Sequence, residues 1–271
     1  LIWEVAPEED FGFEDLASEY YGSATTAVQQ AAMLTRIFEA PHYFHRRGKG
    51  RFRKAPPDIL KAALDPALGL RVGTISSFGA ESAALLHIVA ETDPNVPVVF
   101  LETGQHFLQT LSYRTQLTKA HGLTDVRLVT PDANEKATLD ARDDLWKTDA
   151  DACCDLRKVR PLARATVGFN ALITGRKRYQ AATRAALKPF EVLDGVLRIN
   201  PLADWDADAV EAWLEAHDLP RHPLVEQGYR SIGCWPCTRA VEDDEDARAG
   251  RWSGMDKVEC GIHLGRRQVA A

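Results

Sequence analysis

Five cysteines suggest the chemistry of this sequence first. Cys153 and Cys154 are adjacent, Cys234 and Cys237 form a Cys-x-x-Cys pair, and Cys260 stands alone close to the C-terminal end. Neighbouring side chains on a helix diverge by about 100°, so two adjacent cysteines do not fit one apolar face. Two close pairs are typical of a metal centre, and four thiolates suit either zinc or an iron–sulfur cluster. The remaining thiol is available for nucleophilic chemistry.

The composition is that of an ordinary globular protein. The chain has 271 residues, 45% hydrophobic and 27% charged, with a formal net charge of −6 at pH 7. This acidic balance argues against a general nucleic-acid binder. We expect no membrane span, because no apolar run approaches the ~18 residues that one needs, and no signal peptide. An odd number of cysteines in metal-like spacing is typical of a reducing compartment, so we expect a cytoplasmic protein.

Apolar runs and helical patterns alternate along residues 65–240. Strands are expected over 71–75, 96–101, 126–130 and 171–174, and a hairpin with strands over 191–197 and 198–200 around Asp194-Gly195. Helices are expected over 57–68, 83–90, 107–121, 159–167 and 207–217, and the cysteine pair should lie on a short helix. This alternation predicts an α/β fold, a Rossmann-like parallel sheet with helices on both faces.

Three loops follow expected strands: residues 76–82, 102–104 and 175–178. Ligands of such sheets bind beyond the carboxyl ends of the strands, so we expect these loops to converge on one crevice. The first loop is a Ser- and Gly-containing turn before a helix, where free N–H groups face an anion. It lacks the Gly-Lys-Ser/Thr ending of a Walker loop, and by itself it fits a plain turn equally well.

The two ends of the chain differ from this core. Residues 1–64 form an N-terminal extension with an expected helix over 26–39 and a basic, aromatic run over 41–54. That run would contact RNA or phosphates, or serve as a solvated connector, which we favour. The extension faintly resembles an N-terminal piece of ribonuclease II-type exoribonucleases, and we assign it no catalytic role. Residues 241–271 lack any helical or strand period and are expected to form a mobile tail that folds over the crevice.

Five ordered motifs carry a specific resemblance. They are Cys-Cys-Asp-Leu-Arg-Lys-Val-Arg-Pro-Leu (153–162), Thr-Gly-Arg-Lys-Arg (174–178), Gly-Cys-Trp-Pro-Cys-Thr (233–238), Arg-Ala-Gly-Arg-Trp (248–252) and Glu-Cys-Gly-Ile-His (259–263). Together, over about residues 68–263, they resemble the assimilatory adenylyl-sulfate reductases of the APS/PAPS reductase family. The resemblance implies an adenine nucleotide α-hydrolase-like fold, one [4Fe–4S] cluster on Cys153, Cys154, Cys234 and Cys237, and Cys260 as the catalytic nucleophile.

The reaction implied by this resemblance is the reduction of adenosine 5′-phosphosulfate to sulfite and AMP in sulfate assimilation. Cys260 would attack sulfur and form an S-sulfocysteine, and thioredoxin or a glutaredoxin-like dithiol would then release sulfite. Four protein thiolates leave the cluster no open iron, so it would tune the electrostatics near Lys158 rather than pass electrons.

The resemblance also implies a set of substrate-binding residues. Ser76, Ser77, Phe78 and Gly79 would hold the phosphate, while backbone groups of Leu101 and Gly175 would read the adenine. Lys158, Arg248, Arg251 and His263 would surround the phosphosulfate, and Arg176 in the loop after the fourth strand joins them.

Three other functions remain open. One is a reductase of the 3′-phosphorylated nucleotide (PAPS), although in this family the four extra cysteines accompany the unphosphorylated substrate. Another is a non-catalytic iron–sulfur or zinc sensor, which would have no use for Cys260 on a tail. The third is a tRNA-thiolating enzyme of the same fold, which would need a basic RNA face that the core lacks. A homo-oligomer is compatible with the sequence, and neither a membrane nor a nucleic acid is an expected partner.

Overall fold

The computed structural model describes residues 11–22, 24–38, 44–46, 51–54 and 56–263. Internal contacts divide the chain into two units, Leu1–Ala63 and Leu64–Ala271. The second unit contains all five cysteines. Within the described ranges, no helix is both long enough and apolar enough to cross a membrane.

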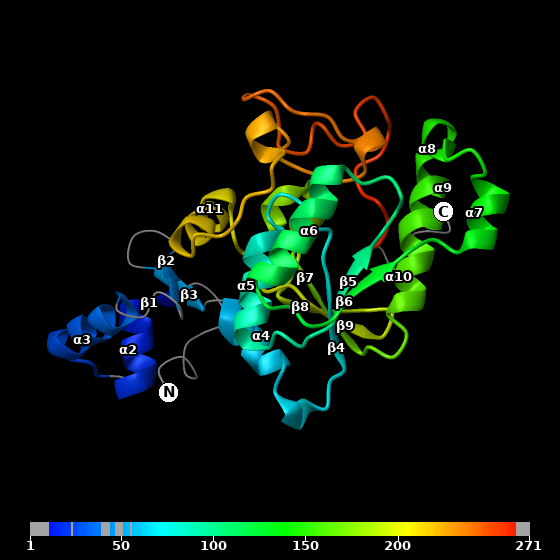
Figure 1. Cartoon of the computed structure of the whole chain (residues 1–271). Coiled ribbons are helices and arrows are strands. Elements are labelled where there is room, and N and C mark those ends of the chain that lie inside the picture. Colours follow the sequence, from blue (N-terminus) through cyan, green and yellow to red (C-terminus); the bar gives the residue numbers. More distant parts are fainter. Residues whose placement is uncertain (1–10, 23, 39–43, 47–50, 55, 264–271) are drawn as a thin grey trace. The chain divides into compact units, whose positions relative to one another are not determined.

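A six-stranded sheet forms the centre of the second unit, in the order β6-β5-β4-β7-β9-β8 (Figure 1). The strands are β4 (Val72–Ile75), β5 (Val98–Leu101), β6 (Val126–Val129), β7 (Ala171–Thr174), β8 (Phe190–Leu193) and β9 (Val196–Ile199). All neighbours are parallel except β8 and β9, which pair antiparallel. Strand order changes direction at β4, which lies between β5 and β7, so the loops after these strands share one edge of the sheet.

The central strands of the sheet are covered on both faces, which accounts for their uninterrupted apolar sequences. All four residues of β5 and of β7 are buried, as expected of parallel strands covered on both sides. Each expected strand of the core is present, with bounds shifted by at most a few residues, and the expected hairpin turns at Asp194-Gly195. The α/β fold that the sequence predicts is therefore confirmed.

Helices connect the strands of this unit. They are α5 (Ser82–Thr92), α6 (Leu108–Ala120), α7 (Ala133–Leu139), α8 (Leu145–Thr148), α9 (Ala150–Cys154), α10 (Arg160–Ala165) and α11 (Ala207–Ala216), with a π-helical turn at Asp155–Val159. Short 3-10 turns lie at Pro66–Leu68, Arg178–Gln180, Ala182–Arg184, Val225–Gln227 and Trp235–Cys237. Asp206 caps α11, because its side chain accepts a hydrogen bond from the backbone N–H of Ala209 at 2.8 Å.

The period of two along β5 directs its side chains to both faces. Val99 and Leu101 pack with Leu162 of α10 in one buried cluster. On the other face, the Phe100 ring meets the ring of Phe78 edge to face at 5.5 Å, from the loop that precedes α5. Figure 1 shows α5 and α6 on one side of the sheet and α10 on the other.

The first unit has a small core and sheet of its own. Its elements are β1 (Phe11–Gly12), α2 (Phe13–Tyr21), α3 (Ala27–Phe38), β2 (Phe44–Arg46), β3 (Arg51–Lys54) and α4 (Pro56–Ala63). Leu16 of α2 packs against Met33 and Ile37 of α3. The run over 41–54, expected to be a solvated connector, contains two antiparallel strands, β2 and β3, where the chain is described. Positive charge does not exclude strand pairing, and aromatic residues favour it. Residues 41–43 and 47–50 of that run lie outside the described ranges.

Candidate active site

One cavity of about 260 Å³ lies at the carboxyl ends of β4, β5 and β7. It brings together residues expected to bind substrate that are far apart in the sequence: Ser76, Ser77, Gly79, Leu101, Lys158, Gly175, Arg176, Arg248, Arg251 and His263. Cys260 lines the same cavity and is partly exposed. The crevice therefore joins three strand-end loops to the arm that carries the lone thiol.

Phe78 is the expected substrate-binding residue that does not line the cavity. Its side chain is fully buried against Phe100, so the aromatic ring belongs to the core. Its backbone adopts φ +49°, a left-handed conformation uncommon for an aromatic residue, and its N–H donates to the hydroxyl of Ser76 at 3.2 Å. This turn directs the chain from β4 into the N-terminal end of α5, where an anion is favoured.

Cations that line the cavity divide into two groups. Five of them pair with carboxylates of the protein: Arg176 with Glu191, Lys177 with Glu81 at 2.8 Å, Arg184 with Glu259 at 2.8 Å, Arg230 with Asp243 at 2.9 Å and Arg248 with Glu259 at 3.5 Å. Among the residues that the structure describes, Lys158 and Arg251 have no carboxylate partner, and the buried Nε of Arg251 has no hydrogen bond. The guanidinium of Arg251 lies 4.5 Å from the ring centroid of Trp252. Lys158 and Arg251 are therefore the cations available to an anionic ligand.

The His263 side chain is held neutral at the wall of this cavity. Burial, followed by the charges of Arg176 and Arg184, holds the pKa of His263 well below its usual range. Its buried Nδ1 has no hydrogen-bond partner in the described part of the chain. A neutral imidazole among cations can accept or donate a hydrogen bond without adding to the positive charge.

The four paired cysteines surround a second, much smaller cavity of about 10 Å³. Cys153 and Cys154 come from the end of α9, and Cys234 and Cys237 from the turn after Gly233, more than seventy residues further along the chain. All four are free thiols, and all but Cys237 are buried. In the described ranges, no three His, Cys, Asp or Glu side chains are close enough to hold a single metal ion. A four-iron cluster binds each thiolate through its own iron, so a wider set of sulfurs around one cavity fits it.

Surroundings affect these thiols differently. Burial, with the neighbouring Cys154, raises the pKa of the Cys153 thiol to about 12. Burial also acts on Cys234, but Lys158 and a hydrogen bond from Thr103 outweigh it and lower the pKa of that thiol. The Thr103 hydroxyl accepts the N–H of Gln105 at 3.1 Å and lies 3.4 Å from the Cys234 sulfur. Cys234 is thus the best prepared of these thiols to bind as a thiolate, whereas burial raises the pKa of Cys237.

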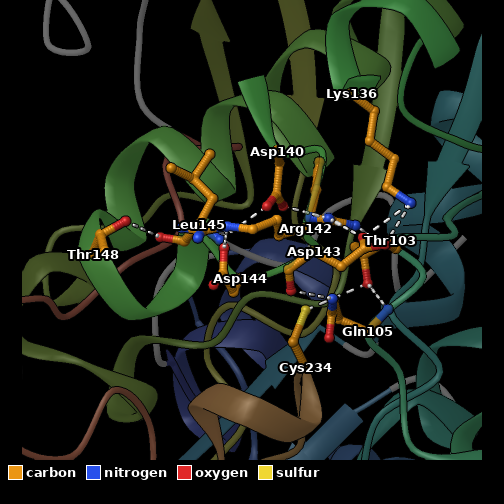
Figure 2. Close-up of polar contacts among 11 residues, drawn as sticks. Thr103, Gln105, Lys136, Asp140, Arg142, Asp143, Asp144, Leu145, Thr148 and Cys234 are labelled. Atoms are coloured by element: carbon orange, nitrogen blue, oxygen red, sulfur yellow. Dashed lines mark hydrogen bonds and ion pairs between the residues drawn. The ribbon is translucent and has the colours of Figure 1, made fainter. Parts of the chain in front are cut away.

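A buried arginine joins the carboxylates of Asp140 and Asp143 to the backbone of Thr103. Figure 2 shows these three partners close to Gln105 and Cys234. Arg157 lies in the π-helical turn that follows Cys154 and is fully buried. Its guanidinium donates to Asp140 at 2.5 Å, to Asp143 at 2.6 Å and to the Thr103 carbonyl at 2.6 Å. Because π-helical turns re-aim side chains, this one directs Arg157 into the protein and Lys158 toward the cavity wall.

The C-terminal arm lines the cavity with residues between Asp246 and His263. The Trp252 side chain is buried, and the backbone N–H of this residue donates to the Cys237 carbonyl at 3.0 Å. Further on, Lys257 pairs with Asp151 and Glu259 with Arg184. The arm does fold over the crevice, whereas its mobility stays a prediction. Residues 264–271 lie outside the described ranges.

Several residues of the cavity were not expected from the sequence. His106 Nε2 donates to the Leu101 carbonyl at 2.8 Å, so one backbone group assigned to adenine already has a partner. Glu81, Gln180, Arg184 and Glu259 also line the cavity and contact one another. Glu259 lies inside a quoted motif and Glu81 in the expected loop 76–82, whereas Gln180 and Arg184 fall in a polar stretch without a motif.

Comparisons with known proteins agree with this architecture. Residues 71–240 match the family model described as the phosphoadenosine phosphosulfate reductase domain. A Mesorhizobium japonicum protein named adenosine 5′-phosphosulfate reductase is 47% identical over 215 residues, 79% of this chain and 85% of that protein. A Deinococcus radiodurans protein of the same name is 42% identical over 220 residues, 79% of this chain and 84% of that protein.

A solved structure extends the likeness to three dimensions. Phosphoadenylyl-sulfate reductase from Candida auris, in a phosphate complex, superposes with a TM-score of 0.59 at 26% identity. The match covers 80% of this chain and 98% of that one. On the strength of its sequence and its fold, the chain belongs to the phosphoadenosine phosphosulfate reductase domain family.

Proposed function

We propose that this protein is an oxidoreductase that reduces adenosine 5′-phosphosulfate to sulfite and AMP in sulfate assimilation. The main support for this proposal is that Cys260 lines the same cavity as the turn after β4, Lys158 and Arg251. A thiol, an anion-binding turn and two available cations are what attack on a phosphosulfate requires. The relatives named adenosine 5′-phosphosulfate reductase support the same substrate.

The first half-reaction transfers the sulfonate group to the protein. The Cys260 thiolate attacks sulfur, a sulfur–sulfur bond forms, and the bond from sulfur to the phosphate oxygen breaks. AMP leaves with the electron pair of that bond, and Cys260 becomes an S-sulfocysteine. Lys158 and Arg251 neutralise the oxygens on which negative charge gathers.

The second half-reaction uses a dithiol of the thioredoxin type. One donor thiolate attacks the Cys260 sulfur, and sulfite leaves with the electron pair of the sulfur–sulfur bond. The second donor thiol then resolves the mixed disulfide, so Cys260 returns as a thiol and the donor is oxidised by two electrons. The partial exposure of Cys260 supports access by such a donor.

We further propose that Cys153, Cys154, Cys234 and Cys237 hold one [4Fe–4S] cluster. Their convergence on one small buried cavity supports this, as does the exclusive use of thiol ligands. Lys158 and Cys234 line both cavities, so a group bound there would lie next to the substrate. When bound, the cluster would supply negative charge that tunes the electrostatics of Lys158. Five free cysteines also support a reducing, cytoplasmic location.

A PAPS reductase is the second candidate, because the structural relative from Candida auris carries that name. The two are separated by comparing kcat/KM for the two nucleotides with the same preparation. We expect a clear preference for the unphosphorylated nucleotide. A preference for the 3′-phosphorylated one would assign the protein to the second candidate.

The proposed function is tested by incubating the protein with adenosine 5′-phosphosulfate and reduced thioredoxin under anaerobic conditions. We expect sulfite and AMP in equal amounts over many turnovers, and neither from Cys260→Ser. Failure of the wild-type protein to form sulfite from either nucleotide, while its iron and its fold are intact, would reject the proposal.

A further inference from the structure

Four side chains form a continuous polar chain from the turn after β4 to the residue before Cys260. The amide nitrogen of Gln180 donates to Glu81 at 2.6 Å, and its amide oxygen accepts from Arg184 at 2.6 Å. Arg184 in turn grips Glu259 with two hydrogen bonds, of 2.8 Å and 2.9 Å. Glu259 is the neighbour of Cys260 in the sequence, so the chain of contacts ends at the nucleophile.

The ion pair between Arg184 and Glu259 fixes the relative orientation of the two side chains. A guanidinium that meets a carboxylate through two parallel hydrogen bonds fixes orientation as well as distance. Their side chains are only 12% and 14% exposed, so water competes weakly for this pair. Arg248 approaches the same carboxylate at 3.5 Å and donates to the Val258 carbonyl at 2.9 Å, so it holds the arm on the other side.

The other end of the chain is anchored equally well. Glu81 lies directly before α5, accepts from Lys177 at 2.8 Å and also binds the hydroxyl of Tyr179. Burial raises the pKa of Glu81, but Lys177 and these hydrogen bonds outweigh it and lower the pKa, so the carboxylate stays charged. A fully satisfied network of this kind is rigid, because moving one member leaves a charged partner uncompensated.

We propose that Gln180 and Arg184 are positioning residues, which place Cys260 by tying Glu259 to Glu81 across the mouth of the cavity. This rests on the proposed function only in naming Cys260 as the nucleophile. We call Glu81, Gln180, Arg184 and Glu259 the relay. It fixes the position of the arm that carries the thiol relative to the turn that would hold the nucleotide.

A direct role of Arg184 in substrate binding is the competing explanation, because Arg184 lines the cavity. The two roles differ in what they affect. If Arg184 contacts the nucleotide, its substitution should weaken nucleotide binding by the same factor as it slows the reaction. The reactivity of Cys260 in the nucleotide-free protein should then stay unchanged. The relay predicts a change at Cys260 in the free protein.

The test measures how fast iodoacetamide alkylates Cys260 in the nucleotide-free holoenzyme, followed by peptide mass spectrometry. The variants are Arg184→Gln, Glu259→Gln and the double variant. Arg239→Gln is the matched control, because Arg239 grips Glu245 with the same paired geometry, at 2.8 Å and 2.7 Å, on the exposed surface. A wild-type reaction with this reagent needs no turnover, so it stays informative even if the proposed function fails.

Each single variant should raise the alkylation rate about tenfold, the size expected for losing charge-assisted hydrogen bonds, and the double variant should add nothing further. A purely electrostatic effect on the thiol would have opposite signs when a cation or an anion is removed. Equal increases from both therefore identify a positional effect. In single turnovers, Arg184→Gln should slow AMP release about tenfold while the Kd of AMP changes less than about threefold.

Gln180→Leu breaks the relay without touching Glu259 and should raise the alkylation rate as well. Rates equal to wild type in all these variants, or additive effects in the double variant, would overturn the proposal. So would a loss of AMP affinity that matches the loss of rate. Failure of the proposed function would show instead as absence of sulfite in the turnover assay, a result that leaves the alkylation rates unaffected.

Discussion

Lys158 and Cys234 stand side by side in the wall between the two cavities and line both of them. Burial lowers the pKa of the Lys158 amine, but electrostatic interaction with the sulfurs of Cys234, Cys260 and Cys154 outweighs it and raises the pKa, so the amine stays charged. In return, Lys158 lowers the pKa of the buried Cys234 thiol. One ammonium group therefore lies beside the four paired cysteines and at the wall of the cavity proposed to bind the substrate.

Replacing Lys158 by alanine should slow the chemical step strongly. Removing one preorganised donor from an active site costs about 10²- to 10³-fold in rate, and we expect that range for AMP release in a single turnover. Lys158→Arg keeps the charge and should recover part of the rate. Iron content measured in each variant serves as the control. A Lys158→Ala protein with normal iron and an unchanged rate would contradict this role.

Loss of Asp140 should destabilise the fold far more than loss of Asp143. Both carboxylates bind the same Arg157 nitrogen, but the Asp140 side chain is 1% exposed and that of Asp143 is 49% exposed. Breaking a buried pair leaves an uncompensated charge, which costs about 3–5 kcal/mol, whereas an exposed pair contributes up to about 1 kcal/mol.

Urea unfolding of Asp140→Asn and Asp143→Asn measures this difference. The midpoint should fall clearly for Asp140→Asn at an unchanged slope, and little for Asp143→Asn. Equal losses in the two variants would show that the burial of Asp140 does not matter.

Acid should destabilise the protein through His222. This side chain is fully buried, and its Nδ1 accepts the N–H of Leu224 at 3.2 Å, which favours the neutral ring. Burial lowers the pKa of His222 from 6.5 to about 4. The unfolded chain therefore binds more protons between these values, and stability falls as the pH drops through this window, by up to about 3 kcal/mol.

His222→Gln removes the titrating group and should flatten the pH dependence of the unfolding midpoint between pH 7 and pH 4.5. The variant is compared with its own value at pH 7, so a general loss of stability does not obscure the result. A wild-type slope retained in the variant would assign the acid sensitivity to other groups.

The four paired cysteines should carry about four irons and four sulfides per chain after anaerobic purification, as the proposed cluster type requires. Cys153→Ser should lose the brown colour of the protein, because the buried pair on α9 then supplies one thiolate fewer. Cys260→Ser should keep the colour and the iron. One zinc per chain without sulfide would refute the cluster.

The sequence predicts the core of this fold well, because parallel strands buried on both faces, such as Val98–Leu101 and Ala171–Thr174, read as short apolar runs. It fails at Arg51–Lys54, where a charged strand pairs in a separate small sheet. There the register is set by neighbours outside the segment, which no local pattern contains.

The candidate site divides in the same way. Cysteines and cations within motifs could be named in advance, and the structure brings them around two adjoining cavities. The role of Phe78 could not, since its ring turns into the core at a left-handed residue. The same holds for Gln180 and Arg184. The partner of Gln180, Glu81, is 99 residues away in the sequence, and the partner of Arg184, Glu259, is 75 residues away. Such pairings follow from the tertiary structure alone.

The most direct test of the whole account is the intact mass of the protein after mixing with adenosine 5′-phosphosulfate in the absence of any dithiol. We predict the gain of one SO₃ group, located on Cys260 by peptide mapping, with about one AMP released per chain because no donor regenerates the thiol. Cys260→Ser should show neither the mass gain nor the AMP while it retains its iron. A sulfonate on another cysteine, or one that persists in Cys260→Ser, would contradict the mechanism.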